Sequence, residues 1–177
     1  PDARRIRKHS FSSARPSPGR TSRPIAPGVS GRSASFTCTE VTREANPGTV
    51  EAAKFAGFRA AGVNRLSLGI QSFDDAKLAA LGRIHSAAEA RRAAELALAH
   101  FDNVNLDLMY ALPGQTPDEA RRDIEAAIAL GPTHISAYHL TLEPNTPFHH
   151  APPPLPDDDL AADMQDMVEA ALAAAGY

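Results

Sequence analysis

The sequence predicts an α/β protein whose parallel sheet curves into part of an open barrel. Three observations support this class. From residue 36 onward, short strand-like runs alternate with helical segments. The connections have the lengths of repeated βα units, which favour a parallel sheet covered by helices. Each expected strand has one apolar face and one small or polar face, whereas strands buried on both faces are almost continuously apolar.

The first βα unit occupies residues 41–61. Residues 41–46 form the expected strand, and Pro47 and Gly48 form a turn. Thr49 is placed to cap a helix that continues to about Ala61, and Gly62 ends it.

The remaining units repeat this order with clearer helix signals. Ser86 and Thr116 each precede a glutamate by three residues, the spacing of a capping box, and Pro117 suits the first helical position. Ser72 has the same spacing to Asp75. These signals predict strands at 65–71, 104–109 and 135–142, and helices at 72–81, 86–101, 116–130 and 157–175.

The polar faces of the four strands indicate a binding site. Successive strand residues point to opposite faces. A closed, filled barrel carries bulky branched residues on its inner face, and unpaired charges buried there are costly. We therefore predict a wet or ligand-filled lumen that receives a polar, partly cationic ligand. The residues on this face are Glu44, Gln71, Asp107 and His139.

Simpler roles for these residues stay open. Glu44 could pair with Arg43 or Arg65 at the rim, and Gln71 could cap a helix. His139 could be a hydrogen-bonded core histidine. In the fourth strand, the alternation groups His139 with Ala137 and Thr141 and places Tyr138 on the apolar face.

Composition excludes several classes of protein. The single cysteine, Cys38, cannot build a disulfide framework, a cysteine-rich zinc module or a self-contained iron–sulfur site. No apolar run is long enough for a membrane span, and a net charge of −3 gives no reason to expect nucleic acid. His149 and His150 lie beside prolines in an expected loop, so we interpret them as surface residues.

Residues 1–38 are interpreted as a disordered or non-native basic arm. Residues 1–35 carry eight Lys and Arg, eight serines and five prolines but a single acidic residue. Such a segment cannot bury enough apolar surface to offset its chain entropy. A nucleic-acid-binding arm and a transit peptide are the alternatives; the first lacks interleaved aromatics and the second lacks an amphipathic helix.

Five segments in order resemble one known family, the radical S-adenosylmethionine (radical SAM) family of oxygen-independent coproporphyrinogen III oxidases. The Gly-Arg-Ile-His and Glu-Pro-Asn-Thr stretches are most similar to the oxidase-like branch typified by the heme chaperone HemW. The segments are EANPGT at 44–49, GVNRLSLGIQSF at 62–73, LGRIH at 81–85, NLDLMY at 105–110 and LEPNTPF at 142–148.

The resemblance implies that residues 39–177 form part of a radical SAM partial (β/α)6 barrel whose lumen holds S-adenosylmethionine. In the family, the residue matching Glu44 binds the methionyl amino end of this cofactor. The residues matching Gln71, Arg83 and Asp107 are further contacts, and His139 falls near another.

The family also implies a [4Fe-4S] cluster on a Cys-x3-Cys-x2-Cys loop, which we expect upstream of residue 40. Cys38 does not match that motif, so no metal ligand and no catalytic residue is assigned, and we expect a fragment without the loop. The abrupt onset of similarity near Thr39 suggests a shifted reading frame, which the genomic sequence upstream of Thr39 tests.

The function that the resemblance implies is that of a HemW-type heme chaperone in porphyrin and heme metabolism. It implies a cytoplasmic location, heme or a porphyrinogen as ligand, and a heme-receiving respiratory protein as partner. The alternatives are a true oxidase, which decarboxylates propionate side chains oxidatively, and a non-functional truncated product. Whether the chain is an enzyme is left open, and without cluster ligands we expect this fragment to be inactive.

Overall fold

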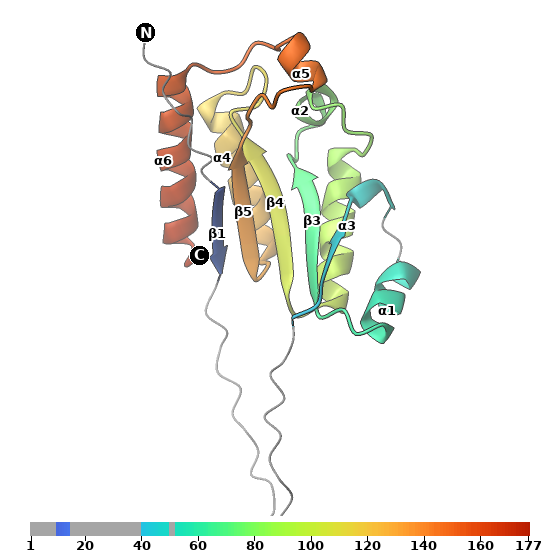
Figure 1. The fold of residues 1–177 in the computed structure, drawn as a ribbon. Coiled ribbons are helices and arrows are strands. Elements are labelled where there is room, and N and C mark those ends of the chain that lie inside the picture. Colours follow the sequence, from blue (N-terminus) through green and yellow to red (C-terminus); the bar gives the residue numbers. More distant parts are fainter. Residues whose placement is uncertain (1–9, 15–39, 50–51) are drawn as a thin grey trace, which may run out of the picture.

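The structure, a computed structural model, describes residues 10–14, 40–49 and 52–177. Within these residues, five strands form one sheet in the order β1-β5-β4-β3-β2 (Figure 1). Four of them run parallel and one edge strand is antiparallel, which confirms the predicted α/β class with a parallel sheet. The strands are β1 (Ser10–Ala14), β2 (Thr42–Ala45), β3 (Arg65–Gln71), β4 (Val104–Tyr110) and β5 (His134–His139).

Three long helices pack against one face of the sheet (Figure 1). The apolar face of β4 lies beneath this helix layer and contacts all three helices. In the part of the chain that is described, no helix combines the length and hydropathy needed to cross a membrane. The helices are α1 (Ala52–Ala60), α2 (Asp75–Ala80), α3 (Ala87–His100), α4 (Pro117–Leu130), α5 (Pro147–His150) and α6 (Asp158–Ala174), of which α3, α4 and α6 form this layer.

The core explains why one face of each strand is apolar. It joins the inward side chains of β3, β4 and β5 to small residues of α3 and α4 and to larger ones of α6. Four alanines of α3 are buried, and their small side chains let this helix approach the sheet closely. The largest buried strand residues are Tyr110, Leu66, Leu68, Ile70, Val104, Leu106, Leu108 and Ile135.

Helix capping follows the sequence signals at two helices and differs at a third. Ser86 and Thr116 each form the predicted capping box with the glutamate three residues on. The cap of α2 is Asp74, whose carboxylate accepts from two backbone N–H groups, and is not Ser72. The Ser72 hydroxyl is used elsewhere, because it donates to the buried Asp123 carboxylate at 2.6 Å.

Replacing Thr116 by alanine should destabilise the protein by about 1 kcal/mol, since it removes the side-chain oxygen that accepts from the Glu119 N–H. Thr116→Ser keeps that oxygen and should retain most of the stability. Urea unfolding followed by circular dichroism measures both. Equal loss in the two variants would show that the hydroxyl is not the stabilising group.

The structure differs from the predictions in further elements. Residues Pro47–Thr49, predicted as a turn and a helix cap, form a 3-10 helix. Residues 10–14 form a strand paired with β5, although the sequence predicts a disordered or non-native arm there. The other residues of the predicted arm, including Cys38, lie outside the described residues. An open sheet edge has unpaired N–H and C=O groups that an extended segment satisfies without any side-chain pattern. The last strand ends at His139, not at 142, and residues 147–150, expected as loop, form a short helix.

Candidate functional site

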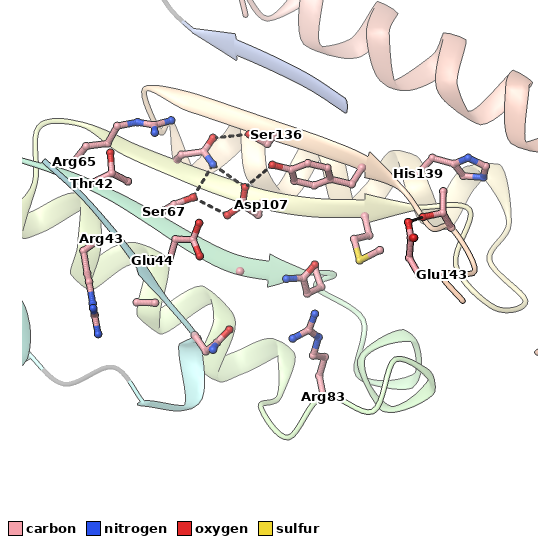
Figure 2. A pocket seen from close by; sticks show the side chains of 18 residues that line it. Thr42, Arg43, Glu44, Arg65, Ser67, Arg83, Asp107, Ser136, His139 and Glu143 are labelled. Carbon is pink, nitrogen blue, oxygen red and sulfur yellow. Dashed lines mark hydrogen bonds between the residues drawn. The ribbon is translucent and has the colours of Figure 1, made fainter. Parts of the chain in front are cut away.

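The polar face of the sheet lines a cavity of about 1350 Å³ (Figure 2). Its wall is built by β2, β3, β4 and β5 together with the segments that follow α2 and β5. The structure brings together all five residues that the sequence predicted for the site. These are Glu44, Gln71, Arg83, Asp107 and His139.

The predicted alternation is confirmed in β3 and β4 and wrong in β5. Ser136 and Tyr138 line the cavity, whereas Ala137 is fully buried in the core. The sequence grouped Ala137 with the polar face because it is small, but a small residue also suits close helix packing. Tyr138 can face the cavity because its ring tolerates partial burial while its hydroxyl makes a polar contact.

His139 lies at the end of β5, at one end of the cavity (Figure 2). Its ring stacks on the buried Tyr110 ring, with centroids 5.5 Å apart and planes at 19°. The histidine is half-buried, so it borders both the core and the cavity. Both roles considered for it therefore have a structural basis, and S-adenosylmethionine contact stays a prediction.

Asp107 is the centre of a hydrogen-bond network in the cavity wall (Figure 2). Ser67 donates to its Oδ2 at 2.6 Å, and the Asn105 amide donates to its Oδ1 at 2.8 Å. The Tyr138 hydroxyl makes a longer contact to Oδ1 at 3.4 Å. The carboxylate accepts from three strands, so its position is set by the sheet rather than by one neighbour.

Burial raises the pKa of the Asp107 carboxyl above its ordinary value. The hydrogen bonds from Ser67, Asn105 and Tyr138 oppose this rise, because they stabilise the ionised form. The nearby Glu44 carboxylate adds to it by repulsion. Two carboxyls near one cavity favour a ligand that brings positive charge or hydroxyl donors.

Glu44 is exposed and lines the cavity, and neither of the arginines considered as its partners forms an ion pair with it. Arg65, one of the partners considered for it, lies 3.7 Å from Glu40 instead, and Arg43 lies over the Phe58 ring. Among the described residues, no hydrogen bond or ion pair to Glu44 is formed. The rim ion pair is therefore not the role of this carboxylate.

Gln71 ends β3 in a left-handed backbone conformation, with φ 68°. The pairing of β3 with β4 shifts between Gly69 and Gln71, which marks a bulge. A side chain at Gly69 would meet the Gln71 amide at 2.9 Å, so glycine leaves room for this amide in the cavity wall. Gln71 does not cap α2, whose cap is Asp74.

Arg83 reaches the cavity from the segment after α2, and its side chain is exposed. Two neighbours fix this segment. The Arg83 N–H donates to the Leu78 carbonyl, and the buried His85 ring lies 3.2 Å from the Ile70 carbonyl. The guanidinium therefore comes from an anchored loop and can meet an anionic group.

The sequence did not assign a role to Ser67, Asn105, Ser136 or Tyr138, which also line the cavity. The first two were recognisable as polar residues on the correct face. Their bonds to Asp107 were not, because these depend on strand register and rotamers. Within the described ranges, no group of His, Cys, Asp and Glu could hold a metal ion, and His149 and His150 are exposed as expected.

Comparison with known proteins identifies the family. The sequence model of the radical SAM superfamily matches residues 38–127. The chain belongs to the radical SAM superfamily. Membership of this superfamily implies S-adenosylmethionine and a [4Fe-4S] cluster as cofactors.

The relatives of this radical SAM chain agree with the resemblance found in the sequence. It is 55% identical over 139 residues to the heme chaperone HemW of Haemophilus influenzae, covering 78% of this chain and 36% of that protein. Identity to HemW of Escherichia coli is 53% over 139 residues, covering 78% and 37%. The chain thus spans little more than a third of these curated relatives.

A solved structure supports the same fold. The coproporphyrinogen III oxidase HemN from Escherichia coli, described as a radical SAM enzyme, aligns with a TM-score of 0.68 at 25% identity. The alignment covers 78% of this radical SAM chain and 33% of HemN. This confirms the prediction of part of a radical SAM barrel.

The residues of the chain fit one of the two implied cofactors. The cavity is lined by three carboxyls, three guanidinium groups and amide groups, which suit the ammonium, hydroxyl and carboxylate groups of S-adenosylmethionine. They do not fit the cluster, because three thiolates are needed and these 177 residues contain one cysteine.

Proposed function

We propose that the chain is the S-adenosylmethionine-binding part of a HemW-type radical SAM protein. The observation that supports this most strongly is that five residues assigned from separate segments line one cavity, in a chain 55% identical to a heme chaperone. Heme as cargo, a respiratory protein as recipient and a cytoplasmic location are parts of the same proposal.

Three charged residues of the cavity have chemical partners on the proposed cofactor. Glu44, whose carboxylate is not paired within the described residues, would hold the methionyl ammonium. Asp107 keeps acceptor capacity beyond its three donors and would accept from ribose hydroxyls. Arg83 would pair with the carboxylate of the methionyl group.

Isothermal titration of the 177-residue chain with S-adenosylmethionine tests this proposal. We expect saturable binding, with ATP as the control ligand, because ATP shares the adenosine but brings negative charge toward Glu44 and Asp107. Binding of ATP as strong as that of S-adenosylmethionine, or no saturable binding by either, would contradict the proposal.

The chain alone should not cleave S-adenosylmethionine. After anaerobic reconstitution with iron and sulfide and addition of dithionite, we expect no 5′-deoxyadenosine above the level without protein, because one cysteine cannot hold a cluster. Chromatography of the reaction mixture measures the product. Formation of 5′-deoxyadenosine in amounts that scale with the chain would show that the prediction is wrong.

The heme-chaperone part of the proposal is tested by exchange. The matched 139 residues of Escherichia coli HemW are replaced by residues of this chain, and the chimera is titrated with hemin. We expect the Soret absorbance change of unmodified HemW, since the exchanged segment is 53% identical. Loss of hemin binding in a folded chimera would contradict this part.

Coproporphyrinogen III oxidation is the second candidate, and the structural similarity to HemN favours it. The same exchange into HemN decides between the two. If this chain belongs to an oxidase, the HemN chimera should decarboxylate coproporphyrinogen III; if it belongs to a heme chaperone, the HemN chimera should be inactive.

A further inference from the structure

Asn105 of β4 is buried in the cavity wall, with 2% of its surface exposed, and all of its amide groups are used. Its Nδ2 donates to the Ser67 hydroxyl at 2.9 Å and to Asp107 Oδ1 at 2.8 Å. Its Oδ1 accepts from the Ser136 hydroxyl at 3.1 Å. A buried amide that is fully bonded has one stable orientation.

The donors of this network are all oriented so that their hydrogen bonds lead to Asp107. The Ser67 hydroxyl gives its single proton to Asp107 Oδ2, so it can only accept from Asn105. Rotating the amide by 180° would place the Asn105 carbonyl against the Asp107 carboxylate, oxygen against oxygen. The hydroxyl of Ser136 stabilises the observed orientation from the opposite side.

Strand register brings these groups together. Asn105 lies opposite Ser67 of β3, and Asp107 lies opposite Ser136 of β5. The amide therefore links two successive pairs of opposing strand residues. Ser67, Ser136 and Asp107 contact it from three different strands. A side chain held from three strands cannot turn without breaking contacts to all of them.

We propose that Asn105 is a positioning residue, which holds the Asp107 carboxylate ionised and in a fixed orientation for the cofactor in the cavity. The inference rests on the proposed function, because the cofactor is taken to be S-adenosylmethionine. Asn105 acts through Asp107 and needs no contact with the cofactor. Its hydrogen bond opposes the burial that raises the pKa of Asp107.

The other groups that face Asp107 are few. Glu44 of β2 repels it and the Tyr138 hydroxyl of β5 donates to it, while β3 contributes only the neutral Ser67. Further titratable residues line the same cavity without a direct bond to Asp107. They are Arg43, Arg65, Arg83, His139 and Glu143.

The test is the pH dependence of S-adenosylmethionine affinity, measured by isothermal titration of the 177-residue chain from pH 4 to pH 8. Affinity should fall as acid protonates Asp107. Asn105→Asp places a second carboxyl within hydrogen-bond distance of Asp107, so the pH midpoint should rise by about one unit or more. Asn105→Ala removes one donor and should raise it less.

Asn103→Asp is the matched control, because it adds the same charge two residues earlier, outside the cavity lining. Its midpoint should stay at the wild-type value, and titration of the ligand itself is common to all variants. A rise in both Asn105 variants but not in Asn103→Asp supports the inference. An unchanged midpoint in the Asn105 variants overturns it.

A second measurement separates this inference from the proposed function. The side-chain carboxyl ¹³C shift of Asp107, followed by NMR without ligand, should show a higher pKa in both Asn105 variants. If wild type binds no S-adenosylmethionine, the proposed function fails, and this titration alone decides whether Asn105 keeps Asp107 ionised.

Should the Asn105 variants fail to fold, Ser136→Ala replaces them. This change removes the hydrogen bond that holds the Asn105 amide in its orientation and keeps both Asn105 and Asp107. The Asp107 pKa should rise in Ser136→Ala. It should stay unchanged in Ser72→Ala, which removes a comparable serine donor from the buried Asp123 of α4, outside the cavity lining. Equal titration of Asp107 in the two serine variants would overturn the inference.

Discussion

Replacing Asp107 by asparagine should weaken S-adenosylmethionine binding about ten- to hundredfold. A hydrogen bond to a charged group contributes about 1.5–3 kcal/mol, and each 1.4 kcal/mol is about a tenfold change in affinity. Asparagine also turns one acceptor oxygen into an NH2 group. That group would face a donor, because Ser67 and Asn105 donate to the two different carboxylate oxygens.

Stability and affinity should respond differently to this change. Burial disfavours the ionised Asp107, so removing its charge also removes a desolvation cost that opposes folding. The lost hydrogen bonds offset that gain, and the unfolding midpoint should move little while affinity falls. A pure folding defect would instead lower both together.

Glu44→Gln tests the second carboxyl and should reduce affinity by a similar factor. Glu95→Gln is the control, since Glu95 is exposed on α3 and does not line the cavity. Isothermal titration measures all three variants at pH 7. Affinity within twofold of wild type for Asp107→Asn would contradict the assignment of this carboxylate to the cofactor.

The parts of the site that could be predicted are those that depend on alternation within one strand. In β3 and β4, large apolar residues occupy every second position, so the opposite face is unambiguous. Glu44, Gln71 and Asp107 then fall on one side of a parallel sheet, because neighbouring parallel strands share their faces. Family resemblance added Arg83, which lies in a loop and has no periodic signal.

β5 shows where alternation is insufficient. Apart from Ile135, its residues are small, polar or aromatic, so the strand has no row of large apolar side chains to identify the core face. Ala137 fits equally well under a helix or on a cavity wall. Packing against α6 decides the matter, and that contact joins segments that are distant in the sequence.

Side-chain networks could not be predicted for a related reason. Asn105 and Ser67 are 38 residues apart, and their bond depends on the register of β3 and β4 and on both rotamers. The same holds for Ser72, whose spacing suggested a helix cap. Its hydroxyl instead donates to Asp123 of α4, 51 residues away, where burial makes an unpaired carboxylate costly.

Leu106→Ala should destabilise the protein by about 3 kcal/mol, within the range of leucine-to-alanine changes in well-packed cores. Leu106 lies in β4, the strand between β3 and β5, and its side chain is completely buried. β4 contacts α3, α4 and α6, so the surrounding side chains cannot easily collapse into the cavity that alanine leaves. A loss of this size is a large fraction of the about 5–15 kcal/mol that stabilises a typical domain.

Urea unfolding followed by circular dichroism measures the loss, and Ile84→Ala is the control. Ile84 also has a large apolar side chain, but 94% of its surface is exposed, so its truncation should change the free energy of unfolding by less than about 0.5 kcal/mol. A Leu106→Ala loss below about 1 kcal/mol would mean that the helices do not pack on β4 as described. The polar face of β4, with Asn105 and Asp107, would then lack the rigid support on which the cavity depends.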